Sequence, residues 1–129
     1  MPKVNMTDRE TKIVELRELV RQFVVERDWQ QFHSPKNLAM ALAIEAAELM
    51  EHFQWLSPEA SRTVRDQSQK LVEVGEELAD VLCYVLAMAN ELNIDLSTTL
   101  RRKMELYGRK YPVHEFRGRY GLEDTSKNL

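Results

Sequence analysis

Residues 38–50 read Leu38-Ala39-Met40-Ala41-Leu42-Ala43-Ile44-Glu45-Ala46-Ala47-Glu48-Leu49-Met50. Only Glu45 and Glu48 are polar, so a helix built from this stretch is apolar on every side, which is typical of a helix that is buried all round. In a chain of 129 residues, covering all of its faces requires a second subunit. The two acids are three residues apart and therefore point the same way. We expect a buried helix with two carboxylates on one face.

A second acidic stripe lies in the segment from about Gln67 to Asn93. Its apolar stripe has helical spacing and consists of Leu71, Val74, Leu78, Val81, Leu82 and Val85. Beside it, at steps of four, three and four, lie Glu73, Glu77, Asp80 and Tyr84. Such a stripe alone is usually a solvated helix face. Together with Glu45 and Glu48, it predicts a cage of four carboxylates.

Four carboxylates in a helical interior need a cation, because two ionised ones at about 4 Å repel by about 4 kcal/mol even at an effective dielectric of 20. A salt bridge to an arginine is the structural alternative, although one positive side chain rarely balances two adjacent acids. Hard oxygen ligands suit Mg²⁺ or Mn²⁺ rather than zinc. The sequence contains no Cys/His cluster that competes with this interpretation.

The remaining segments predict an all-α fold, a bundle of four main helices with a short connecting helix. A capping-box spacing at Thr7 predicts a first helix to about Arg27, and Ser34-Pro35 and Ser57-Pro58 predict two further helix starts. The second helix extends to about Leu56, and the last covers about Leu96 to Arg109. We expect one domain over residues 1–112 and a weakly ordered C-terminal tail over residues 113–129.

Composition limits the class of protein. The net charge of −3 argues against a general nucleic-acid binder, and the longest apolar run, Val81 to Ala89, is far below the roughly 18 residues that span a membrane. Residues 1–5 contain no apolar core of a signal peptide. The single cysteine, Cys83, excludes an internal disulfide and fits a reducing compartment. We expect a cytoplasmic protein with no membrane and no nucleic-acid polymer as partner.

The acidic pairs and their flanks resemble a known family. Glu45-x-x-Glu48, then 28 residues, then Glu77-x-x-Asp80 is similar to the signature of the MazG-like all-α nucleoside triphosphate pyrophosphohydrolases. The dCTP pyrophosphatase branch is matched by Glu26-Arg27-Asp28-Trp29-Gln30-Gln31-Phe32-His33, Pro35-Lys36-Asn37-Leu38, Glu48-Leu49-Met50-Glu51-His52-Phe53-Gln54-Trp55 and Glu77-Leu78-Ala79-Asp80-Val81-Leu82-Cys83-Tyr84. The likeness covers roughly residues 16–111.

This resemblance implies Mg²⁺-dependent hydrolysis of a nucleoside triphosphate between its α and β phosphates, with dCTP or a modified pyrimidine deoxynucleotide as substrate and nucleotide-pool house-cleaning as role. It implies that Glu45, Glu48, Glu77 and Asp80 hold the metal, and that the base lies against Trp29, Phe32, His33, Trp55 and Tyr84. It also implies a homotetramer built as a dimer of dimers. Two departures from the branch, Val20 in place of a histidine and Tyr107 in place of an asparagine, leave the preferred base open.

Seven basic residues against two acids over residues 101–119 indicate where the pyrophosphate end docks. Lys103, Arg109 and Lys110 are the candidates, whereas Arg101 and Arg102 are equally well explained as a soluble helix end. Two other classes of helical protein carry clustered carboxylates. A ferritin-like di-iron bundle needs Glu-x-x-His pairs, which the sequence lacks. A non-catalytic helical oligomeric binding module, with its carboxylates in structural ion pairs, is the alternative that stays open.

Overall fold

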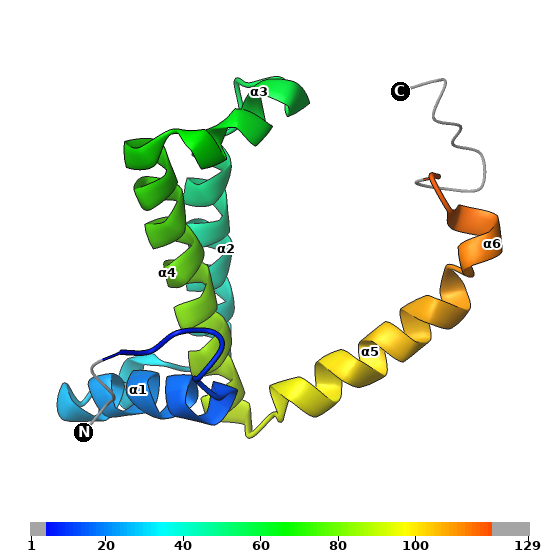
Figure 1. Cartoon of the computed structure of the whole chain (residues 1–129). Helices are drawn as coiled ribbons and strands as arrows, with labels where there is room; N and C mark the ends of the chain where they lie inside the picture. Colours follow the sequence, from blue (N-terminus) through cyan, green and yellow to red (C-terminus); the bar gives the residue numbers. More distant parts are fainter. Residues whose placement is uncertain (1–4, 120–129) are drawn as a thin grey trace. The chain divides into compact units, whose positions relative to one another are not determined.

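The computed structural model describes residues 5–119, in which every regular element is helical and no strand occurs. The predicted all-α fold is therefore confirmed (Figure 1). The helices are α1 (Ile13–Glu26), α2 (Pro35–Glu51), α3 (Pro58–Arg62), α4 (Ser68–Leu92), α5 (Leu96–Lys110) and α6 (Val113–Phe116), with short 3-10 helices η1 (Gln30–Phe32) and η2 (Thr63–Asp66). The chain divides between Asn93 and Ile94 into two compact units, which are described separately.

The first unit is built on an antiparallel pair, α2 and α4, which pack along their lengths (Figure 1). The α1 helix crosses the end of this pair where α4 finishes. Reciprocal hydrogen bonds fix that crossing: Arg17 Nε donates to Asn90 Oδ1, and Asn90 Nδ2 donates to the Arg17 carbonyl, each at 3.0 Å. Arg17 Nη2 also donates to the carbonyl of Ala89, near the negative end of the α4 dipole. These bonds set the position of α1 beside the carboxylates.

Two of the predicted helix starts are confirmed by their capping bonds. Ser34 Oγ accepts from the Asn37 amide and Ser57 Oγ accepts from the Ala60 amide, each at 3.1 Å, and a proline follows each serine. Asn93 ends α4 in the left-handed conformation, with φ of 52°. The α2 helix ends at Glu51, and turns carry the chain on to Leu56.

The predicted start of the first helix at Thr7 is wrong. The Thr7 carbonyl accepts from the amides of Glu10 and Thr11, which closes an isolated turn, and α1 begins only at Ile13. The amide of Lys12 donates to Glu15 Oε2 at 2.7 Å. The acidic partner that helps to satisfy the start of the helix is therefore Glu15 and not Glu10.

The second unit consists of α5 and α6. The Asp95 side chain caps α5 by accepting from the Thr98 amide at 2.9 Å. The rings of Tyr111 and Phe116 meet edge to face, with centroids 5.1 Å apart, and join the end of α5 to α6. The α6 helix falls within residues 113–129, where we expected a weakly ordered tail. Residues 1–4 and 120–129 lie outside the described part of the chain.

The isolated chain leaves much apolar surface uncovered. Among residues 5–119 the buried apolar side chains are Val24, Leu38, Val64, Leu86, Ala87 and Ala89. Along α2, by contrast, Met40, Ile44 and Met50 are exposed, and Ile44 retains 59% of its accessible surface. This is the helix whose sequence is apolar on all sides. No helix among the described residues combines the length and hydrophobicity that crossing a membrane requires.

Candidate metal and nucleotide site

Three of the four predicted carboxylates form a cluster where α2 and α4 pack together. Glu45 and Glu48 of α2 and Glu77 of α4 each contribute one carboxylate oxygen, and these oxygens all lie within 4.8 Å of one another. The i, i+3 spacing puts the first two on one face of α2, and the antiparallel pairing brings Glu77 opposite them. The cluster is thus a direct consequence of the two acidic pairs in the sequence.

The surroundings of the cluster oppose ionisation. Burial, followed by the charges of Glu48 and Asp80, raises the pKa of Glu45 from 4.5 to about 7. Burial, followed by the charge of Glu48, also raises the pKa of Glu77. Oε2 of Glu45 and Oε2 of Glu77 are shielded from solvent and have no hydrogen-bond donor among residues 5–119. Two acceptor oxygens are therefore directed into a space in which the described chain supplies no donor.

Asp80 lies beside this cluster but is not one of the three acids whose carboxylate oxygens lie within 4.8 Å of one another. Its charge contributes to the raised pKa of both Glu45 and Glu77, which places it close to them. The imidazole of His52 acts in the opposite direction, on the pKa of Glu77. Within residues 5–93 none of the four acids forms an ion pair. The arginine-bridged alternative considered from the sequence therefore finds no partner in this unit.

The donor set fits a divalent cation. Carboxylate oxygens are the ligands that Mg²⁺ and Mn²⁺ accept in proteins, and the two shielded oxygens have unused lone pairs. Burial first, and then repulsion by Glu48 and Asp80, raises the pKa of Glu45, and a bound cation would favour the ionised form. Glu48 is exposed, so the cluster is open to solvent on one side. An ion held there would keep room for water or for a ligand oxygen.

A cavity of about 480 Å³ adjoins these acids in the first unit. Glu45 and Asp80 line it, and so do Trp29, His33 and Tyr84, three of the side chains predicted to contact the base. Burial and then the charge of Glu45 raise the pKa of Tyr84, so its hydroxyl stays protonated. The structure thus joins aromatic side chains and carboxylates in one cavity, as expected for a ligand with a flat ring and a charged end.

Trp29 is held by the turn that follows α1. Asp28 has a φ of 53°, a left-handed conformation that turns the chain out of the helix. The amide side chain of Gln31 donates to the Asp28 carbonyl at 3.0 Å. The indole of Trp29 meets Phe23 edge to face at 5.7 Å, and the Arg27 guanidinium lies 3.6 Å from the centroid of the Phe23 ring. This stack supports one wall of the cavity.

Other residues predicted for the site lie elsewhere. Phe32 is exposed and does not line the cavity. Trp55 retains 88% of its surface and follows the far end of α2, a helix whose 17 residues span about 25 Å. Lys103, Arg109 and Lys110 are exposed on α5 in the second unit. Within residues 5–93, Phe32 and Trp55 are therefore not brought to the cavity, and the role of the three basic residues of the second unit stays a prediction.

Sequence reasoning missed several side chains of this cavity. Leu19, Phe23 and Cys83 line it, with Val20 and Val24 beside them. None of these side chains is among the site residues that the sequence predicts. The spacing of Phe23 on α1, one turn before the turn that carries Trp29, was the signal that could have paired the two rings.

Known proteins with similar sequences agree with the resemblance that the acidic pairs and their flanks predict. The profile of the MazG-like family matches residues 40–128. The chain belongs to the MazG-like family. It is 40% identical over 109 residues to dCTP pyrophosphatase 1 of Rattus norvegicus, covering 84% of this chain and 64% of that protein. The human dCTP pyrophosphatase 1 is 38% identical over 105 residues, covering 81% and 62% respectively. The chain thus spans less than two thirds of these curated relatives.

A solved structure also resembles this member of the MazG-like family. The crystal structure of a pyrophosphatase from Archaeoglobus fulgidus aligns with a TM-score of 0.71 and 37% sequence identity. The alignment covers 85% of this chain and 99% of the archaeal one. The expected resemblance to MazG-like pyrophosphohydrolases, on the dCTP pyrophosphatase side, is confirmed at the level of sequence and fold.

Proposed function

We propose that this chain is a Mg²⁺-dependent nucleoside triphosphate pyrophosphohydrolase, with Mn²⁺ as a possible substitute. Its substrate is dCTP or a modified pyrimidine deoxynucleotide, and its products are the monophosphate and pyrophosphate. The observation that carries the proposal is the cavity shared by Trp29, Tyr84, Glu45 and Asp80, which adjoins the carboxylate cluster. The names of the relatives support the same activity. House-cleaning of the cytoplasmic nucleotide pool is the role that we infer.

The carboxylates give this site its chemistry. Glu45, Glu48, Glu77 and Asp80 are the residues proposed to hold the metal. A divalent ion held by these carboxylates would supply neutralisation of the triphosphate, polarisation of a phosphoryl oxygen and a lower pKa of an attacking water. Glu48 is the exposed member of the cluster, and we propose that it orients and deprotonates that water as general base. The protonated Tyr84 hydroxyl remains available as a hydrogen-bond donor.

The substrate's orientation follows from the two ends of the cavity. The base lies against Trp29 and His33, and the phosphates extend toward Glu45 and Asp80. Because four acids repel a polyanion, cations must lie between them and the phosphates. We propose that Lys103, Arg109 and Lys110 bind the pyrophosphate end, since all three are exposed cations of a basic segment.

We propose that the active form is a homo-oligomer, a dimer of dimers. The exposed Met40, Ile44 and Met50 on α2 support it, because apolar surface on this scale is normally covered by a partner. Trp55 supports it too, since α2 separates it from Trp29 within one chain. We therefore propose that the Trp55 indole reaches the base cavity from a second copy of the chain. Phe32 is proposed to reach it in the same way, where the subunits meet.

Product analysis tests the proposed reaction. Incubation with dCTP and Mg²⁺ should yield dCMP and pyrophosphate in equal amounts. The products are measured by ³¹P NMR. Release of dCDP and inorganic phosphate would contradict cleavage between the α and β phosphates. Glu45→Gln and Asp80→Asn should abolish turnover while the oligomer stays folded, and Glu76→Gln, an exposed acid of α4 outside the cluster, is the matched control.

A non-catalytic binding module is the second candidate that the sequence left open. It requires the carboxylates to be tied up in ion pairs, and among residues 5–93 the four acids form no such pair. It also predicts no stabilisation by Mg²⁺. A thermal shift with Mg²⁺ and a non-hydrolysable dCTP analogue separates the two, because only the enzyme hypothesis expects a rise in melting temperature.

A further inference from the structure

Two partly exposed rings, Phe23 and Trp29, form an aromatic wall of the base cavity of about 480 Å³. Phe23 retains 48% of its accessible surface and Trp29 retains 42%, so neither ring is fixed by burial. The two rings meet edge to face, with an interplanar angle of 74°. Among residues 5–119, Phe23 is the only ring that stacks with Trp29. The orientation of the indole therefore depends on that of the Phe23 ring.

Arg27, the residue that ends α1, holds the Phe23 ring in place. The two residues are four positions apart, so their side chains lie on the same face of the helix. The guanidinium carbon lies over the Phe23 ring, 3.6 Å from its centroid. Arg27 Nη1 also donates to the Phe23 carbonyl at 3.0 Å, which keeps the guanidinium over the ring. Arg27 itself is not one of the residues that line the cavity, so it can act on a bound base only through Phe23.

Two simpler roles for Arg27 are a surface ion pair and electrostatic attraction of the triphosphate. Arg27 Nη1 lies 3.8 Å from Glu26 Oε2, but the two side chains retain 42% and 58% of their surface, and an exposed pair of this kind contributes little. Electrostatic attraction acts on any polyanion and requires only a positive charge. Stacking on Phe23 together with a bond to its carbonyl requires the planar guanidinium, so a lysine cannot replace it fully.

We propose that Arg27 is a positioning residue for the base: it clamps Phe23, Phe23 orients Trp29, and the indole stacks on the pyrimidine. The inference rests on the function proposed above, which assigns the base to this cavity. Arg27 touches neither the substrate nor the carboxylates, so it acts on the binding of the base and not on the chemical step. Its loss lowers the affinity for the base and leaves the affinity for the phosphates unchanged.

Steady-state kinetics with two fragments of the substrate as competitors test this role. Arg27→Met should raise the KM for dCTP and the inhibition constant of uncharged deoxycytidine about fivefold each, with kcat within about 1.5-fold of the wild type. The inhibition constant of pyrophosphate should not change. Arg27→Lys keeps the charge without the planar stack and should weaken deoxycytidine about threefold. In Phe23→Leu, which removes the ring, Arg27→Met should have no further effect.

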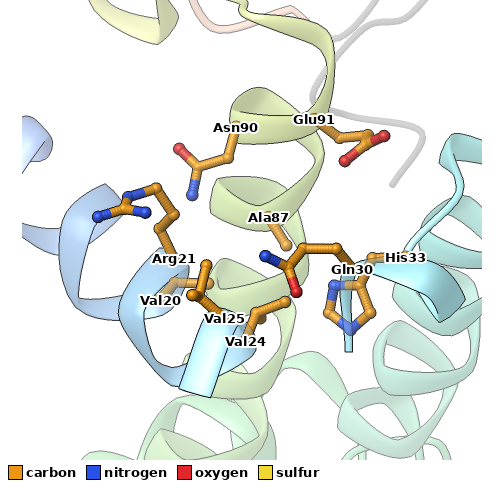
Figure 2. Close-up of a pocket in the computed structure, with 9 residues that line it drawn as sticks. All are labelled: Val20, Arg21, Val24, Val25, Gln30, His33, Ala87, Asn90 and Glu91. Carbon is orange, nitrogen blue, oxygen red and sulfur yellow. The ribbon is translucent and has the colours of Figure 1, made fainter. Parts of the chain in front are cut away.

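Arg21→Met is the matched control. Arg21 lies on the same helix, is bonded to Glu18 and borders a second cavity of about 240 Å³, which neither Phe23 nor Trp29 lines (Figure 2). The change removes one positive charge from α1 without removing a contact of the aromatic wall. It should therefore alter neither the KM for dCTP nor the inhibition constant of deoxycytidine.

Near-ultraviolet circular dichroism follows the indole independently of catalysis. The chain has two tryptophans, so in a Trp55→Phe background the indole band comes from Trp29 alone. Adding Arg27→Met should reduce this band while the far-ultraviolet spectrum and the melting temperature stay the same, which also excludes misfolding as the cause.

The outcomes separate this inference from the proposed function. Arg27→Met with an unchanged deoxycytidine constant and an unchanged indole band overturns the positioning role, even if dCTP is hydrolysed. Weakening of pyrophosphate as large as that of deoxycytidine shows attraction by charge and also overturns it. If the wild type releases no pyrophosphate, calorimetry of deoxycytidine replaces the kinetics, and binding that depends on Arg27 then supports the inference and overturns the proposed reaction. A wild-type chain that neither hydrolyses dCTP nor binds deoxycytidine overturns both.

Discussion

A carboxylate oxygen of Glu45 in α2 lies within 4.8 Å of one of Glu77 in α4, and each side chain keeps its Oε2 shielded from solvent. Two acids in such proximity are stable only if protons or a cation lie between them. In the metal-free protein, the raised pKa of both groups means that protons take the place of the cation. The stability of the protein should therefore depend on pH and on divalent ions together.

We expect the free energy of unfolding of the metal-free protein to fall as pH rises from about 4.5 to about 7, through the contribution of Glu45. In this range the folded state, with a pKa of about 7, binds more protons than the unfolded state, with 4.5, and a higher pH therefore favours unfolding. Urea titrations in EDTA across this range measure the effect, and Glu45→Gln should remove it.

Saturating Mg²⁺ should reverse this trend, because the ion replaces the protons. Identical pH profiles for the wild type and Glu45→Gln would contradict the account. The Arg21–Glu18 pair lowers the pKa of Glu18 and acts in the opposite direction, so the comparison of the two proteins, and not the wild-type slope alone, is decisive.

We expect the two tryptophans to act on one base from different subunits. Trp29→Ala and Trp55→Ala should each raise the KM for dCTP about 10-fold, since a stacked base is worth about 1–3 kcal/mol. Co-assembled subunits of the two variants should recover a low KM in half of the mixed sites, because one site then has both indoles. If mixing restores nothing, Trp55 does not act across subunits.

We expect Ile44→Lys to disrupt the oligomer. In the single chain Ile44 is exposed, so a lysine there would be tolerated by a monomer, whereas in an apolar interface an unpaired charge is strongly destabilising. Analytical ultracentrifugation should show a lower mass for this variant and an unchanged mass for Ile44→Leu. A wild-type chain that sediments as a monomer would remove the basis of the prediction.

We expect Asn90→Ala to lower the free energy of unfolding by about 1–3 kcal/mol. The change removes the Asn90 bonds of Arg17 Nε and of the Arg17 carbonyl in a part-buried position. Because these bonds place α1 against α4, the KM for dCTP should rise while the metal affinity stays within about twofold. Denaturant titration measures the free energy of unfolding, steady-state kinetics the KM, and metal titration the metal affinity. A loss of metal affinity as large as the rise in KM would argue against this division of roles.

The helices that the sequence predicted well are those with strong local signals. Ser34-Pro35 and Ser57-Pro58 each combine a capping hydroxyl with a proline, and both start helices where expected. Thr7 has the right spacing for a capping box, but its carbonyl closes a turn instead. The acidic pairs could be placed because helical spacing fixes the face of each pair, whereas the antiparallel packing of α2 and α4 is known only from the structure.

The aromatic half of the site was harder to predict. His33 and Trp29 reach the cavity only because Asp28 turns the chain in a left-handed conformation, which no periodicity announces. For Trp55 and the basic residues of α5, the role in the site stays a prediction.

The most direct test is a calorimetric titration of Mg²⁺ into the metal-free protein at pH 7, repeated in two buffers with different enthalpies of ionisation. We predict one saturable event that releases about half a proton, because Glu45 with a pKa of about 7 is half protonated there and must ionise to bind the metal. Glu45→Gln and Glu77→Gln should weaken binding at least 10-fold, and Glu76→Gln should not. Binding that is unaffected by the first two variants, with no release of protons, would contradict a metal held between α2 and α4.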